Sequence, residues 1–180
     1  MFYKDDRLAV LIDGTNFSAA AKALSFDVDF NRLRGEFSQR GRLMRIGYYT
    51  RIVDNEEHLP IRPLLDWLSY NGFHVVTRSA REFTDSNGRR RIKGTTNTNL
   101  IVDAMEIAHS LDHLVLISGD SDFVPLVETL QRRGLRVSVA STLKSTPPMA
   151  SDDLRRAADN FIEINDWLEL MSKRREEVAG

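Results

Sequence analysis

The sequence contains no cysteine, which excludes disulfide bonds and thiolate metal sites. No apolar run approaches the roughly 20 residues that are needed to cross a bilayer, and the first seven residues lack the apolar core of a signal peptide. The formal net charge of −1 excludes a uniformly basic surface, although a local basic patch is compatible with it. From these absences we expect a cytoplasmic protein without a membrane partner.

The order of the segments predicts one α/β domain. A length of 180 residues favours one domain over two, and strand-like segments alternate with helix-like ones, as in a parallel sheet between two layers of helices. We expect a three-layer fold with a central, mainly parallel sheet of about five strands. The expected strands are 8–12, 42–50, 73–77, 114–117 and 136–140, with an edge strand at 161–164. The expected helices are 16–24, 29–40, 60–71, 97–109 and 122–133.

Two of these apolar segments end in aspartate. Residues 8–12 are followed directly by Asp13, and residues 114–117 by Ser118, Gly119 and Asp120, with Asp122 two positions later. Polar groups that follow buried parallel strands lie at the carboxyl edge of the sheet, where open α/β folds bind ligands. Carboxylates that converge there repel one another unless a cation or a proton intervenes. A divalent metal that assists phosphodiester cleavage is one use of such a site.

The same aspartates also suit a purely structural role as helix caps. Asp13 precedes a helix start, although Thr15 or Asn16 could serve as the cap instead. Asp120 is the stronger candidate for a metal ligand, and Asp122 is either a second ligand or a cap. Asn16 is expected to orient Asp13 or to bind a phosphate or a metal-bound water.

Two further groups are candidates for the site. Asp103 and Asn99 are four residues apart on an expected helix and therefore share a face; an exposed helical acid is the plain alternative for Asp103. Residues 85–88 have a turn composition, so we expect a projecting hairpin that carries basic residues for RNA binding, where a solvated basic loop is the alternative. These basic residues are Arg89, Arg90, Arg91 and Lys93. The four histidines, His58, His74, His109 and His113, are expected at the surface without a catalytic role.

Several stretches, in consistent order over residues 8–165, resemble the NYN domains, relatives of the PIN nucleases, and in particular their bacterial LabA-like branch. The stretches are Leu11 to Asn16, Lys93-Gly94 leading to Leu100 to Ala104, Ile117 to Leu126, Ser141 to Met149 and Asp153 to Arg156. The resemblance implies a PIN-like Rossmannoid fold in which the five expected strands are ordered 3-2-1-4-5. It also implies a Mg²⁺- or Mn²⁺-dependent ribonuclease site, and we expect single-stranded RNA as the substrate. By position it implies that Asp13, Asp103, Asp120 and Asp122 are the catalytic and metal-binding acids, with Asn16 and Ser118 as polar support.

The chain departs from this family pattern at two positions. Family members usually carry acids after the Lys-Gly pair, where this chain has Asn97 and Asn99. Because hard cations prefer charged carboxylates, the change implies a weakened metal site, an altered specificity or an RNA-binding protein without turnover. The metal-dependent endoribonuclease and the inactive RNA-binding or regulatory protein therefore both stay open. A nucleotide-binding domain is disfavoured, since no glycine-rich phosphate loop follows the first strand.

The expected organisation is one NYN domain over residues 1–165 and a helical tail over residues 166–180. The tail contains Trp167, Leu168, Leu170 and Met171. This apolar content suits packing either on the domain itself or on a partner such as a second copy of the chain.

Overall fold

The computed structural model describes residues 1–53, 61–84 and 88–167. The strands are β1 (Arg7–Asp13), β2 (Arg42–Val53), β3 (His74–Thr84), β4 (Arg90–Lys93), β5 (His113–Ile117), β6 (Arg136–Ser141) and β7 (Asn160–Glu163). The α-helices are α1 (Gly14–Ala23), α2 (Phe30–Arg40), α3 (Arg62–Tyr70), α4 (Asn97–Ile107), α5 (Val124–Arg132) and α6 (Asp152–Ala157). Short 3-10 turns are η1 (Ala108–Ser110), η2 (Ser121–Phe123) and η3 (Ile164–Trp167).

The strands form one sheet in the order β4-β3-β2-β1-β5-β6-β7. All neighbouring strands are parallel except β3 and β4, which are antiparallel. The 3-2-1-4-5 order expected for the first five predicted strands is therefore confirmed, and the predicted edge strand is β7. The sheet contains the five strands expected at its centre, and the expected hairpin and edge strand add β4 and β7 at its two edges.

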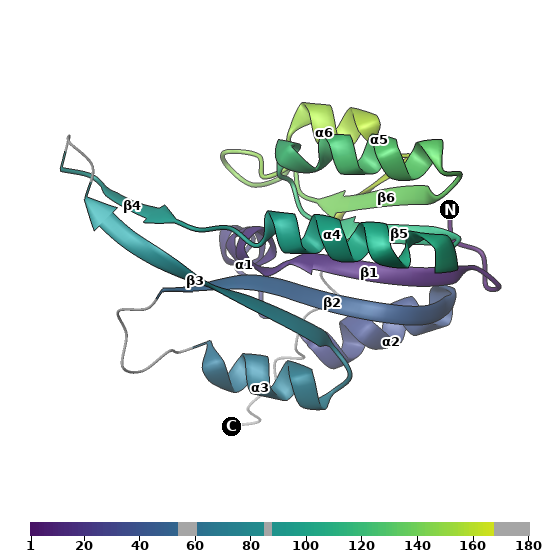
Figure 1. The fold of residues 1–180 in the computed structure, drawn as a ribbon, viewed down its shortest axis with the longest axis horizontal. Helices are drawn as coiled ribbons and strands as arrows, with labels where there is room; N and C mark the ends of the chain where they lie inside the picture. Colours follow the sequence, from purple (N-terminus) through teal and green to yellow (C-terminus); the bar gives the residue numbers. More distant parts are fainter. Residues whose placement is uncertain (54–60, 85–87, 168–180) are drawn as a thin grey trace, which may run out of the picture.

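Helices cover both faces of the sheet, as the alternating pattern predicts (Figure 1). Phe17, Leu33 and Leu68 place α1, α2 and α3 on one apolar core. The second core includes Leu100 of α4, Val127 of α5 and Leu154 of α6, on the opposite face. β1 and β5 are central and buried on both faces, which explains their unbroken apolar sequences. Within the described part of the chain, we find no helix with the length and apolar character that spanning a membrane requires.

The expected hairpin is confirmed as the pairing of β3 with β4, and it makes β3 longer than predicted. Residues 81–84 pair with residues 90–93, and these two segments form an arm that extends beyond the carboxyl edge of the sheet (Figure 1). The expected turn at residues 85–87, the expected helix start at Pro60 and the tail beyond Trp167 lie outside the described residues.

His113 contradicts the expectation of a surface histidine. It opens β5 and is 0% exposed. Its Nε2 lies 2.8 Å from Ser138 Oγ, and Phe2 packs on its ring. Burial, together with the charge of Arg136, lowers its pKa to about 4. His113 is therefore a neutral core residue at the amino edge of the sheet.

The buried histidine predicts a pH dependence of stability. Since the pKa of His113 is about 4 in the fold and 6.5 in an unfolded chain, only the unfolded state takes up this proton between those values. We expect the free energy of unfolding to fall by about 3 kcal/mol from this residue as the pH drops across that interval. Urea unfolding at a series of pH values measures the slope. His113→Gln should flatten it, whereas His109→Gln, at an exposed position, should not; an unchanged slope in His113→Gln would contradict the assignment.

Candidate active site

Asp13 lies at the junction of β1 and α1 and has two roles at once. Its backbone is the N-cap of α1, and its Oδ1 accepts a hydrogen bond from the backbone N–H of Asn16 at 3.2 Å. Its Oδ2 accepts from Ser118 Oγ at 2.9 Å, across the boundary between β1 and β5. The cap role that the sequence left open among three residues thus belongs to Asp13, and capping does not prevent the same carboxylate from facing a ligand.

Asp120 is tied to Asp13 through the turn after β5. Its backbone N–H donates to Ser118 Oγ at 3.2 Å, so one hydroxyl links the two aspartates. The Oδ1 atom of Asp120 caps η2 by accepting from the backbone N–H of Asp122 at 2.9 Å. Gly119, which lies between Ser118 and Asp120, donates its N–H to Asn16 Oδ1 at 3.0 Å. The ends of β1 and β5 are therefore joined by a hydrogen-bonded network of side chains and backbone.

The electrostatics of this network disfavour two bare carboxylates. Asp13 is only 5% exposed, and its burial raises its pKa above the usual range. The hydrogen bonds from Asn16 and Ser118 oppose this shift, while the charge of Asp120 adds to it. A positive charge placed between the two carboxylates would remove the repulsion and part of the burial penalty.

A pocket of about 300 Å³ opens beside these groups at the carboxyl edge of the sheet. Its walls come from the ends of β1 and β2, the start of α1, the start of α4 and the turn after β5. The lining residues are Asp13, Thr15, Asn16, Ala19, Arg51, Thr95, Thr96, Asn97, Asp120 and Met149. Four of the sequence-predicted site residues, Asp13, Asn16, Asn97 and Asp120, thus meet here.

Arg51, Thr95 and Thr96 also line the pocket and were missed by the sequence reasoning. The sequence does contain a signal for Arg51. Arg51 lies two residues after Tyr49 on β2 and therefore on the same face of the sheet, and β2 runs to the same edge as β1. The expected strand ends at residue 50, one residue before Arg51. Thr95 and Thr96 precede α4, and nothing in their sequence context distinguishes them from an ordinary helix start.

Asn97, one of the two departures from the family pattern, contacts Asp120 directly. Its Nδ2 donates to Asp120 Oδ2 at 3.0 Å, and its Oδ1 accepts from Thr95 Oγ1 at 2.7 Å. The amide therefore presents its donor side to the carboxylate. A carboxylate at this position would repel Asp120 instead and would add a ligand oxygen for a cation.

Asp103 and Asn99 do not reach the pocket. Both lie on one face of α4, as their spacing predicts, and this face is turned toward β2 and β3. Asp103 Oδ2 accepts from Tyr49 at 2.8 Å and lies 3.3 Å from His74 Nε2; burial and this carboxylate raise the pKa of Tyr49, so that its hydroxyl stays a donor. Asn99 Oδ1 accepts from Arg78 Nε at 3.0 Å. In this arrangement Asp103 holds α4 against the sheet.

The remaining predicted residues lie around the pocket rather than in it. Asp122 is exposed in η2, and Arg89 is exposed at the start of the arm's second segment. Arg90, Arg91 and Lys93 are placed on β4 by their backbone, on the same side of the molecule as the carboxyl edge (Figure 1). Their role in RNA binding stays a prediction.

The oxygen donors of the pocket fit one hard divalent cation. Asp13 and Asp120 contribute carboxylates, and the desolvation of Asp13 is the feature that a cation would relieve. The described residues contain no group of three or more Asp, Glu, His or Cys side chains with metal-binding geometry. The four predicted aspartates therefore do not form one cluster, and the fit rests on two of them.

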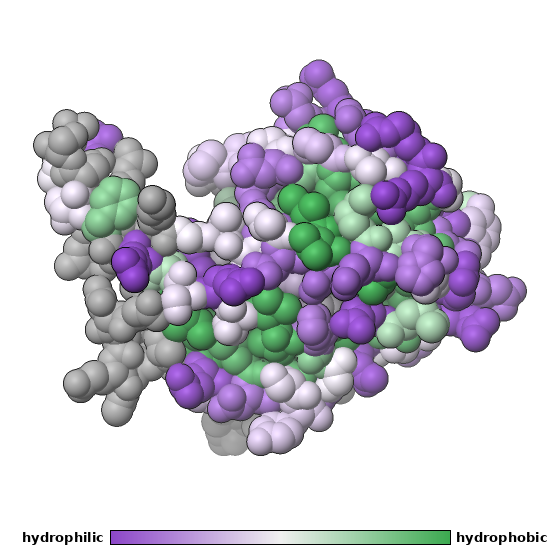
Figure 2. Space-filling view, viewed as in Figure 1, coloured by the Kyte–Doolittle hydropathy of each residue, from purple (hydrophilic) through white to green (hydrophobic). Residues whose placement is uncertain are grey.

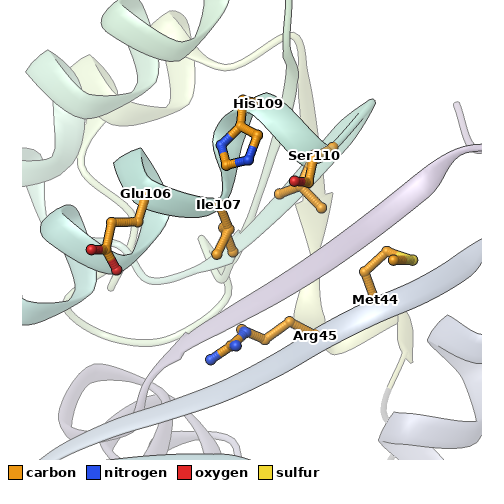
Figure 3. A pocket seen from close by; sticks show the side chains of 7 residues that line it. Met44, Arg45, Glu106, Ile107, His109 and Ser110 are labelled. Carbon is orange, nitrogen blue, oxygen red and sulfur yellow. The ribbon is translucent and has the colours of Figure 1, made fainter.

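A second pocket, of about 500 Å³, lies near the opposite end of α4 (Figure 3). Met44 and Arg45 of β2 form one wall, and Glu106, Ile107 and His109 are on the other. This pocket is at the amino ends of the strands, where open α/β sheets do not place their ligands. The pocket at the carboxyl edge is therefore the candidate active site.

Comparisons with known proteins agree with this fold. The chain is 29% identical over 177 residues to the low amplitude and bright protein LabA of Synechococcus elongatus, covering 96% of this chain and 91% of that protein. A crystal structure of a Vibrio parahaemolyticus protein of unknown function is similar at a TM-score of 0.73 and 26% identity, over 92% of this chain and 97% of the other. The NYN domain matches residues 7–165. The chain therefore belongs to the NYN domain family, a nuclease-like family with a PIN-like α/β fold.

Proposed function

We propose that this protein is a divalent-metal-dependent endoribonuclease and that the pocket at the carboxyl edge is its active site. The observation that carries the proposal is the convergence of Asp13 and Asp120 on one pocket, with the pKa of Asp13 raised by burial and by the second carboxylate. Two carboxylates held in this way are suited to a hard cation such as Mg²⁺ or Mn²⁺. Membership of a nuclease-like family supports the reaction class.

The residues of the pocket have different roles in the proposed hydrolysis. Asp13 and Asp120 would hold the ion, which when bound lowers the pKa of water and polarises the phosphodiester. Ser118 and Asn16 fix the orientation of Asp13 through its two oxygens. Among the described residues that line the pocket there is no histidine. Arg51 faces the same space and can bind a phosphate oxygen.

RNA is the proposed substrate because Arg51 lines the acidic pocket and a strand with further basic residues lies at the same edge of the sheet. The arm places the backbone of Arg90, Arg91 and Lys93 beyond the carboxyl edge of the sheet (Figure 1), the edge at which the pocket lies, and Arg89 directly precedes it. Such groups neutralise backbone phosphates and make affinity depend on salt. The pocket is open at the edge of the sheet, which suits cleavage within a strand rather than at its end.

One observation favours a second function, an RNA-binding protein without turnover. The hydrogen bond from Asn97 Nδ2 to Asp120 Oδ2 occupies an oxygen that a cation would use. An amide in this position also leaves the site with one negative charge fewer than a carboxylate would give. The two functions differ in whether Mn²⁺ binds and whether RNA is cut.

An acid at position 97 distinguishes the nuclease from the RNA-binding protein without turnover. We expect Asn97→Asp to raise both Mn²⁺ affinity and the rate of RNA cleavage by about tenfold, because the new carboxylate adds a ligand and removes the hydrogen bond that competes for Asp120. The same change should lower the melting temperature of the metal-free protein, since it sets two carboxylates side by side. Calorimetric titration with Mn²⁺ and gel analysis of an end-labelled single-stranded RNA measure the first two quantities.

Asn99→Asp is the matched control, because it makes the same chemical change two residues away and outside the pocket. Its Mn²⁺ affinity should stay at the wild-type value. If wild-type protein leaves RNA intact with excess Mn²⁺ and Asn97→Asp does not gain cleavage, the nuclease proposal is wrong and the binding function replaces it.

A further inference from the structure

Arg51 and Arg78 lie opposite each other on neighbouring strands. They are register partners in the parallel pairing of β2 with β3, and strands paired in this way are about 4.8 Å apart. Register partners in a parallel pair point to the same face. Both side chains are on the face that carries α4, since Arg51 lines the pocket with residues from the start of α4 and Arg78 contacts Asn99. Two positive charges in this arrangement repel each other.

The pair has no acidic partner at ion-pair distance in the described part of the chain. Neither arginine makes an ion pair with a residue of the described ranges. Arg78 donates from Nε to Asn99 Oδ1 at 3.0 Å, so its orientation is fixed by a neutral amide that leaves the charge intact. The next acid on the same face of α4, Asp103, is held by Tyr49 and His74. The terminal nitrogens of Arg78 are thus oriented but not compensated.

The pair is next to the candidate active site. Arg51 shares its pocket with Asp13 and Asp120, so the carboxyl edge has negative groups at the ends of β1 and β5 and positive groups on β2 and β3. Figure 2 looks onto the face of the sheet that α4 covers and shows hydrophilic side chains across its middle, with apolar patches above and below them. Guanidinium groups bind phosphate oxygens through paired N–H donors. A chain of phosphates could therefore lie on the arginines while the next linkage enters the pocket.

We propose that Arg51 and Arg78 form a phosphate clamp that binds the RNA backbone beside the carboxylate pocket and sets which linkage enters it. The proposal rests on the proposed function for the identity of the ligand. RNA is favoured over an acidic peptide because Asp13 and Asp120 beside the clamp would hold the divalent ion of the proposed nuclease, and that ion would supply a site for the next phosphate of the same strand. Asn99 is a positioning residue for Arg78.

The test measures RNA binding in the presence of a chelator, which removes cleavage from the readout. An end-labelled single-stranded RNA is titrated with wild-type protein, Arg51→Gln, Arg78→Gln and Asn99→Asp, and its fluorescence anisotropy is followed at several salt concentrations. We expect each arginine variant to bind about tenfold more weakly, since a charge-assisted contact is lost, and the salt slope to fall by about 0.7 for each phosphate contact removed from a single strand. Asn99→Asp should also weaken binding, because its carboxylate would neutralise Arg78.

Arg133→Gln is the matched control: it removes one exposed arginine at the end of α5, beside the amino edge of the sheet. It should bind RNA within about twofold of wild type and keep the salt slope. The melting temperatures of Arg51→Gln and Arg78→Gln should stay the same or rise at low salt, since the repulsion between the pair is relieved. If both variants are folded and bind RNA with the affinity and salt slope of the wild type, the clamp is wrong.

The two proposals fail separately in these measurements. If wild-type protein does not cut RNA with Mn²⁺ but loses affinity in both arginine variants, the nuclease proposal falls and the clamp stands. If it cuts RNA while the arginine variants bind as tightly as the wild type, only the clamp falls.

Discussion

Asp13→Asn is expected to lower Mn²⁺-dependent RNA cleavage by at least about 100-fold, because it replaces one of the two charged metal ligands of the pocket with a neutral amide. The hydrogen-bond pattern should survive the change. The asparagine Oδ1 can still accept from the backbone of Asn16, and its amide can donate to Ser118 Oγ, which then accepts both from this amide and from the backbone N–H of Asp120 and no longer donates to residue 13. The loss of activity would therefore report on charge rather than on unfolding.

The same substitution is expected to raise the melting temperature of the metal-free protein. Burial and the charge of Asp120 raise the pKa of Asp13, so the ionised carboxylate is a source of instability that a neutral amide removes. Excess Mn²⁺ should raise the melting temperature of wild-type protein, since a ligand that binds only the folded state stabilises it, and should leave that of Asp13→Asn unchanged. Thermal unfolding with and without Mn²⁺ measures both effects.

Asp29→Asn provides the control for the capping role. Asp29 caps α2 just as Asp13 caps α1, by accepting from a backbone N–H three residues later, but it is not part of the pocket. Its replacement should change neither cleavage nor the response to Mn²⁺. If Asp13→Asn retained wild-type cleavage, the carboxylate would be a cap alone and the proposed site would be wrong.

Gly119→Ala is expected to destabilise the fold by about 3 kcal/mol or more, since overpacking of a filled site has effects of this size. A Cβ at this position would overlap the backbone carbonyl of Met149 and lie 2.7 Å from Ser141 Oγ. The backbone there cannot shift freely, because Gly119 donates to Asn16 and its carbonyl accepts from the N–H of Ser151 at 2.9 Å. The turn that carries Asp120 would be displaced, so cleavage should fall with stability.

Gly35→Ala is the comparison for this change. Gly35 lies inside α2, and a Cβ there would meet nothing within 4 Å. Alanine at that helical position should stabilise the protein by about 0.5–1 kcal/mol. Urea unfolding of both variants gives the two free energies. A Gly119→Ala protein as stable as the wild type would mean that the segment after β6 moves away from the turn easily and does not hold the site in place.

The sequence predicted the sheet well because its signals are local. Unbroken apolar segments at residues 8–12 and 114–117 indicate central parallel strands, and the structure places β1 and β5 there. Two helices also begin at residue types that favour the N-cap position, Asp29 and Ser151, and each side chain accepts from a backbone N–H three residues on. The two edge strands are less clearly marked in the sequence, because β4 pairs only as part of the arm and β7 is short and half-buried.

The site was only partly predictable, because its membership depends on distances between elements. Asp13 and Asp120 follow paired strands and had to meet. Asp103 shares the direction of Asn99 on α4, but the way this helix lies on the sheet turns both toward β2 and β3. Arg51 enters the pocket only because β2 continues past the predicted end of the strand. His113 was misread because a histidine that opens a buried strand has no sequence pattern of its own.

The most direct test of the central claim is the location of the metal. Crystals soaked in Mn²⁺ should give an anomalous difference peak between the carboxylates of Asp13 and Asp120, in the pocket at the carboxyl edge. Crystals of Asp13→Asn treated in the same way should lack it. An absent peak in the wild type, or one at Glu106 and His109 in the pocket at the other end of α4, would contradict the account.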